Sequence, residues 1–220
     1  MKTPDYELAA IKAAETLQKY GISTAPVMPI TILKRIPGVL VLSFKEMSQL
    51  SGIDRSSLIS LCGEQNQDAV TTVHVDDGKL RYVVAYNQML PLYVVQRALA
   101  RELGHIILGH DGTKPEEVRS AESICFAQHL LCPRPLIHSL QAANIRITVE
   151  VFGNLTGCYD SCLACIRKMP ATHVPADLNR AVRDQFMDYI INYFEYQRTA
   201  MRKDGSALAD FGSFMDGYEE

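Results

Sequence analysis

Apolar and polar positions follow two periods along the chain, one helical and one extended. Residues 6–20 carry apolar side chains at helical spacing and stop at Gly21, a common helix-terminating residue. Three short apolar stretches predict strands: 39–44, 69–75 and 80–86. The last two are separated by Asp76-Asp77-Gly78, which is typical of a hairpin turn. We therefore expect a small antiparallel sheet after the first helix.

The remaining pattern is helical. A segment that follows Pro91 and ends near Gly109 is apolar around most of its circumference, except for a polar strip of Arg101, Glu102 and His105. Further helices are predicted at 30–35, 116–131, 134–143, 147–168 and 177–200. No repeat or low-complexity linker interrupts the pattern. The chain is therefore predicted to be one α+β domain over residues 1–202, followed by a disordered tail over 203–220.

Composition and charge narrow the function classes. With 220 residues, of which 47% are hydrophobic and 21% charged, the chain can build one well-packed core. A net charge of −3 argues against direct binding to nucleic acid, which normally needs a basic surface. The first residues lead straight into an amphipathic stretch, so we expect no secretory leader, and no apolar run reaches about 18 residues, the length that a membrane span needs. We expect a cytoplasmic protein without a membrane partner.

Six cysteines allow two interpretations. Cys158, Cys162 and Cys165 contain a CxxC pair, which suggests a metal or redox site. Their spacing also matches one face of a helix, and a free cysteine behaves as a small buried apolar residue. Because only three thiols are present in this cluster, packing in the core is the favoured interpretation.

The polar strip of the apolar helix differs by one residue from a zinc-protease motif. In HExxH, two histidines on one helix face bind zinc and the glutamate is the general base. Here Arg101 stands at the first histidine position, and a guanidinium has no free lone pair for a metal. The alternative is that Glu102 and His105 have only a structural role. Gly104, in mid-helix, indicates that another backbone or a ligand comes close there.

Two segments together carry a family resemblance. The first is Arg97-Ala-Leu-Ala-Arg-Glu-Leu-Gly-His-Ile-Ile-Leu-Gly-His110, and the second is Phe126-Ala-Gln-His-Leu-Leu-Cys-Pro133. They resemble the AHELGH and ExxANxFAxxLLxP segments of the ImmA/IrrE family of zinc metallopeptidases, and the order of elements extends the similarity over about residues 1–145. The resemblance implies a zincin-like α+β fold, with a small antiparallel sheet, a motif helix and a helical C-terminal half.

The resemblance also implies roles for individual residues. The first zinc ligand falls on Arg101, the catalytic base on Glu102 and the second metal ligand on His105. The third ligand is open, because the usual acidic position is Ser120 whereas Glu122 lies two residues further on. Helical spacing places Ser120 on the apolar face of Ile124, Ala127 and Leu131, and Glu122 on another face with Cys125 and His129.

Two functions follow from these positions. One is a pseudopeptidase without zinc, which regulates a helix-turn-helix repressor of a mobile element or stress response. The other is an active zinc endopeptidase that cleaves such a repressor, with a metal site rebuilt by His110, His129, Cys125 or His74. For the first, we expect Arg101 to replace the metal by pairing with Glu102 or Glu122.

Overall fold

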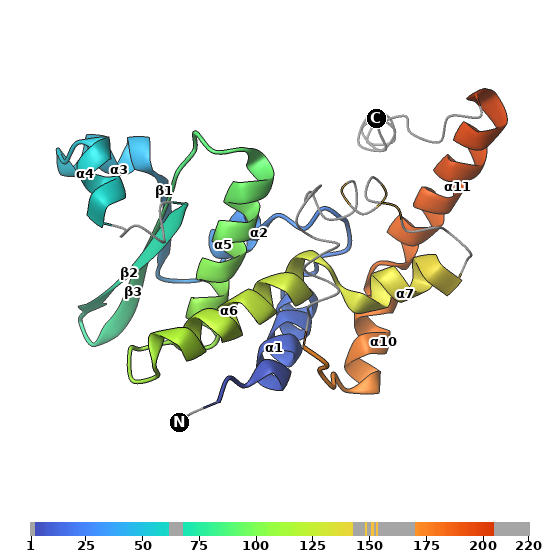
Figure 1. The fold of residues 1–220 in the computed structure, drawn as a ribbon, viewed down its shortest axis with the longest axis horizontal. Helices are drawn as coiled ribbons and strands as arrows, with labels where there is room; N and C mark the ends of the chain where they lie inside the picture. The colour runs from blue at the N-terminus through green and yellow to red at the C-terminus, as the bar shows by residue number, and fades with distance from the viewer. Residues whose placement is uncertain are drawn as a thin grey trace.

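The computed structural model describes residues 3–61, 68–142, 148, 151, 153 and 170–204. The strands and the motif helix lie on one side of the molecule and the C-terminal helices on the other (Figure 1). No helix in these ranges is both long enough and apolar enough to span a bilayer. The cysteine cluster, most of the predicted helix 147–168 and the last part of the predicted tail lie outside the described residues.

A three-stranded sheet forms the β part of the fold. Its strands are β1 Val39–Ser43, β2 Ala69–Asp76 and β3 Lys79–Tyr86, in the order β1-β3-β2. The β2–β3 hairpin is antiparallel as predicted, and Asp77 and Gly78 turn it with positive φ angles of 48° and 71°. The expectation of a wholly antiparallel sheet is corrected, because β1 pairs with β3 in parallel. The predicted α+β fold is confirmed.

Two short helices that the pattern did not predict follow β1. They are α3 Phe44–Ser51 and α4 Arg55–Leu61. Ser43 ends the strand and caps α3, because its side chain accepts from the Glu46 backbone N–H while the Glu46 carboxylate accepts from the Ser43 backbone. Phe44, predicted to end a strand, is therefore the first residue of a helix and is fully buried.

The helices before and after the sheet surround the core. They are α1 Tyr6–Lys19, α2 Pro29–Leu33, α5 Leu92–Ile107, α6 Glu116–Leu131 and α7 Arg134–Ala142. Helix α6 packs against both α1 and α5, and its Phe126 and Leu130 are fully buried between them. Small residues of α1, Ala9 and Ala13, allow this close packing. The core thus fixes α5 and α6 side by side.

The predicted C-terminal helix 177–200 is two helices. They are α10 Ala176–Gln185 and α11 Met187–Asp204. The break falls at Phe186, whose side chain is fully buried and whose φ and ψ of −92° and 5° leave the helical region. Burial of this aromatic ring therefore accompanies a change of helix direction that periodicity did not reveal.

Candidate functional site

Helix α5 carries the motif residues and lies very close to α6. A Cβ atom at Gly104 would lie 3.0 Å from Cδ1 and 3.2 Å from Cγ of Phe126, which is closer than ordinary packing allows. A close approach at Gly104 is therefore present, but the approaching group is the Phe126 side chain of α6 and not the backbone or ligand that we expected. This contact therefore fixes a close spacing between α5, which carries the motif, and α6.

A cleft of about 860 Å³ opens beside these residues. It is bordered by α5, by the loop 109–112, by the first half of α6 and by strand β2. The polar side chains that line it include Arg101, Glu102, His105, His110, Arg119 and Ser120. The three motif residues thus face one cavity, as expected for a working or former active site.

The turn after α5 brings a second histidine back to the first. Gly109 adopts a left-handed conformation with φ of 64°, and the His110 backbone N–H donates to the His105 carbonyl at 3.0 Å. The Nδ1 atoms of the two imidazoles lie 2.8 Å apart. His110 is therefore an additional site residue, and the Gly-His pair after the motif was its signal in the sequence.

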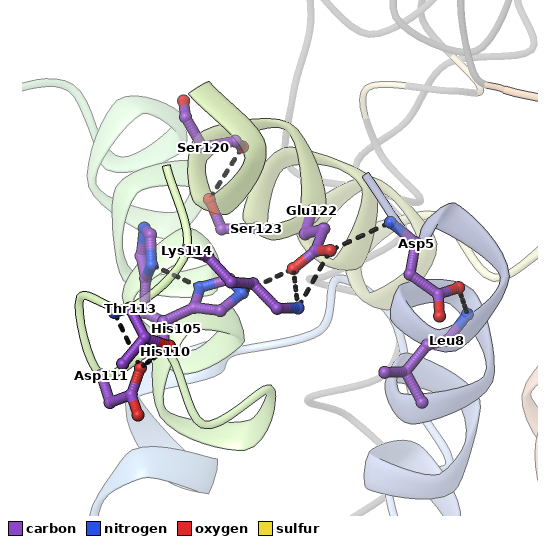
Figure 2. Close-up of polar contacts among 10 residues, drawn as sticks. All are labelled: Asp5, Leu8, His105, His110, Asp111, Thr113, Lys114, Ser120, Glu122 and Ser123. Atoms are coloured by element: carbon purple, nitrogen blue, oxygen red, sulfur yellow. Dashed lines mark hydrogen bonds and ion pairs between the residues drawn. The ribbon is translucent and has the colours of Figure 1, made fainter. Parts of the chain in front are cut away.

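His110 links the cleft to a buried carboxylate (Figure 2). Its Nε2 lies 2.8 Å from Oε2 of Glu122, and these side chains are only 1% and 2% exposed. Lys114 donates from Nζ to both carboxylate oxygens at 3.1 and 2.8 Å, and the Asp5 backbone N–H donates to Oε1 at 2.9 Å. The chain His105–His110–Glu122 thus ends on a carboxylate whose two oxygens are both hydrogen-bonded.

The pKa shifts favour one direction of hydrogen bonding along this chain. Burial alone would raise the pKa of Glu122, but the Asp5 N–H, Lys114 and His110 outweigh it and lower the pKa. Burial lowers the pKa of His110 despite its bond to Glu122, so we assign its single proton to Nε2, facing the carboxylate. Its Nδ1 then accepts from the Nδ1–H of His105.

The same assignment leaves Nε2 of His105 with a free lone pair. Burial, followed by the charges of His110, Arg101 and Arg119, lowers the pKa of His105 to about 4. The imidazole is therefore neutral near pH 7, with an Nε2 that can accept a hydrogen bond or bind a metal.

Glu102 lies on the same helix face, next to strand β2. Burial raises the pKa of Glu102, while Thr71 of β2 and the charge of Arg101 act in the opposite direction. A carboxyl group with a raised pKa in a cleft is typical of a general base, and it is also typical of a buried structural group. Its role as the catalytic residue stays a prediction.

The predicted pairing of Arg101 with Glu122 is wrong, and toward Glu102 Arg101 acts through its charge without forming an ion pair in the described part of the chain. Glu122 is instead bound by His110, Lys114 and the Asp5 backbone. Within the described ranges, Arg101 forms no hydrogen bond or ion pair, and its buried Nε has no partner. The physical reason is the direction of Glu122, which turns from the cleft toward α1.

The two candidates for a third ligand lie on different sides of α6. Ser120 and Ile124 border the cleft, and Ile124 is 41% exposed. Glu122, Cys125 and His129 form a buried face instead. The helical spacing therefore separated the two groups correctly, but only part of the face that we took as apolar is buried: Ala127 and Leu131 lie in the core, whereas Ser120 and Ile124 open to the cleft. The assignment of His105 and Glu122 as metal ligands stays a prediction.

Of the four residues considered for a rebuilt metal site, one lies at the cleft. His110 contacts His105, whereas the Cys125 thiol donates to the Tyr6 carbonyl and His129 contacts Thr172. His74 is exposed on β2, next to Thr72. Among the residues that the structure describes, no group of three or more His, Cys, Asp or Glu side chains is arranged to hold a metal ion.

Comparison with known families agrees with the motif. Residues 62–156 match the peptidase-family model described as the IrrE N-terminal-like domain. This segment contains the whole of α5 and α6 and most of the cleft residues. No curated protein matches the chain, and no solved structure does. Residues 62–156 therefore resemble an IrrE N-terminal-like domain, in agreement with the metallopeptidase-like motif of α5.

Proposed function

We propose that this protein is a pseudopeptidase that binds a peptide segment of a transcriptional repressor and regulates the repressor by occupancy. It does so without zinc and without hydrolysis. The repressor belongs to the helix-turn-helix class and controls a mobile element or a stress response. The protein acts in the cytoplasm and does not itself contact nucleic acid or membrane.

The observation that carries this proposal is the guanidinium of Arg101 in the cleft. It occupies the position of the first metal ligand that the resemblance implies, and it cannot coordinate an ion. The third position offers either the Ser120 hydroxyl or Glu122, and Glu122 is held by Lys114 and His110. Catalytic zinc generally has three protein ligands and one open position. These residues do not fit such an ion, and we assign no hydrolytic step.

Strand β2 supports the binding of an extended peptide. The sheet order β1-β3-β2 leaves β2 at an edge, and its Val70, Thr71 and Val73 line the cleft. An edge strand offers unpaired backbone N–H and C=O groups, to which a peptide can add as a further strand. The free Nε2 of His105 can accept a hydrogen bond from the same peptide.

The alternative is an active zinc endopeptidase with a rebuilt site. Two neutral imidazoles, His105 and His110, and the carboxyl group of Glu102 favour it, because these are the donor types that zinc binds in proteins. Glu102 would then be the general base, as the resemblance implies. The cations of Arg101 and Arg119 act against a metal ion at this place.

The two functions are separated by mixing the protein with a helix-turn-helix repressor encoded beside it, in a zinc-containing buffer. Calorimetry measures binding, and mass spectrometry of the intact repressor measures cleavage. We expect binding with an uncut repressor, and the same binding for Glu102→Gln. Cleavage that Glu102→Gln abolishes would establish the endopeptidase instead. The absence of both binding and cleavage would refute a role with this repressor.

A further inference from the structure

Two arginines that border the cleft are short of hydrogen-bond partners. Arg101 comes from α5 and Arg119 from α6, and the Nε atom of each is buried without a hydrogen-bond partner. In the described part of the chain, neither guanidinium takes part in an ion pair. A buried donor on a charged group is costly when nothing accepts from it. A ligand that supplies the acceptor removes this cost.

Both arginines line the same cleft as His105, although they come from different helices. Their charges act on the His105 imidazole. Both guanidinium groups therefore add positive charge to this cleft.

No acidic side chain that lines the cleft forms an ion pair with these arginines in the described part of the chain. The charge of Arg101 acts on Glu102 without such a pair. Asp111 accepts from the backbone N–H and the hydroxyl of Thr113 in the loop. Glu116 is exposed at the start of α6. Solvent or a bound molecule can therefore supply an acceptor for Arg101 and Arg119.

We infer that Arg101 and Arg119 together bind the carboxylate of an Asp or Glu side chain, and that the ligand of this cleft is an acidic peptide. The inference rests on the proposed peptide-binding function and specifies its ligand class. A guanidinium matches a carboxylate with two parallel N–H donors. The apolar side chains of Val70, Val73 and Ile124 line the same cleft and accept the neighbouring side chains of an extended peptide.

Selection from a library of random octapeptides tests the ligand class. The full-length protein is compared with Arg101→Gln, with Arg119→Gln and with Arg97→Gln, an arginine of α5 that is not among the described lining residues. We expect Asp and Glu to be enriched in peptides selected by the unmodified protein and by Arg97→Gln, and not in those selected by the other two variants.

A peptide from this selection is then used to measure how much its acidic residue contributes to binding. Replacing its acidic residue by the matching amide should weaken binding to the unmodified protein about tenfold to a hundredfold, the size of a charge-assisted hydrogen bond. The Arg101→Gln variant should bind both peptides equally. Its melting temperature should be no lower than that of the unmodified protein, because the guanidinium that it loses forms no ion pair in the described part of the chain. This measurement distinguishes the loss of a contact from the loss of the fold.

Failure of this inference differs from failure of the proposed function. Peptides that bind without acidic enrichment, and equally well to Arg101→Gln, would overturn the carboxylate site and leave peptide binding intact. If no peptide binds, titration with N-acetylglutamate, followed by the shifts of the histidine ring protons, decides the rest. If N-acetylglutamate shifts the ring protons of the unmodified protein but not those of Arg101→Gln, the arginine site is supported without peptide binding. If it shifts none of them, both the arginine site and the proposed peptide binding are overturned.

Discussion

Nε2 of His110 lies 2.8 Å from Oε2 of Glu122, inside the protein rather than in the cleft. This contact fastens the loop after α5 to helix α6, and the Asp5 backbone N–H adds the start of α1 to the same carboxylate. Lys114 supplies a countercharge with a side chain that is 32% exposed. Glu122 is therefore a structural junction of three segments as well as the end of the histidine chain.

Replacing Glu122 by Gln should destabilise the protein. The amide keeps the shape but loses the charge that Lys114 and His110 face, so we expect the free energy of unfolding to fall by about 2–3 kcal/mol. Urea denaturation measures the change. Glu117→Gln, an exposed glutamate on the same helix, is the matched control and should change stability by less than about 0.5 kcal/mol. If both variants changed the free energy of unfolding equally, Glu122 would not be a structural junction.

A methyl group at position 104 should also destabilise the protein. Gly104→Ala gains about 1 kcal/mol of helix propensity but places its Cβ 3.0 Å from the Phe126 ring, and overpacking of this kind costs about 1–3 kcal/mol. We expect a net loss in thermal unfolding. In the double variant with Phe126→Leu, the two effects should be less than additive. Strict additivity would mean that the two residues do not contact each other.

The protein should become less stable as the pH is lowered, because of His129. Burial, followed by the charge of Arg134, lowers its pKa from 6.5 to about 4. The unfolded chain binds this proton near pH 6.5 and the folded protein only near pH 4, so the contribution is complete above pH 6.5 and is lost as pH falls toward 4. The loss amounts to at most about 3 kcal/mol.

The comparison with His129→Gln isolates this residue. The difference in unfolding free energy between the two proteins, measured by urea denaturation at a series of pH values, should shrink as pH falls from 7 to 4. A difference that stays constant over this range would show that His129 titrates alike in the folded and unfolded chain.

Two substitutions should rebuild a metal site if the third ligand falls at position 120. Ser120 lines the cleft with His105, whereas Glu122 is turned away and hydrogen-bonded. The double variant Arg101→His with Ser120→Glu should therefore bind close to one zinc ion per chain in calorimetric titration. Arg101→His alone should bind zinc more weakly. Equal affinity of the single and double variants would exclude position 120 as the third ligand.

Local patterns predicted the elements that surround the cleft. The hairpin of β2 and β3 followed from two apolar stretches and an Asp-Gly turn, and the contact at Gly104 followed from a glycine in mid-helix. These features depend on neighbouring residues. The parallel pairing of β1 and the break at Phe186 depend on contacts between distant segments, which no local period encodes.

In the candidate site, too, the features set by local spacing were predicted, and those set by contacts between distant segments were not. The motif spacing placed Arg101, Glu102 and His105 on one helix face correctly, because the helical period determines that face. It did not reveal that Glu122 accepts from Asp5, 117 residues earlier in the chain, or that His110 folds back on His105. The missing partner of Arg101 is likewise a property of the packed structure.

The zinc content of the purified protein tests the central claim most directly. The protein is prepared without a metal-affinity tag, dialysed against zinc and then against metal-free buffer, and its metal is quantified by mass spectrometry. The guanidinium of Arg101 at the first ligand position predicts a content near zero per chain. A content near one zinc per chain would contradict the pseudopeptidase and would point to a site rebuilt around His105 and His110.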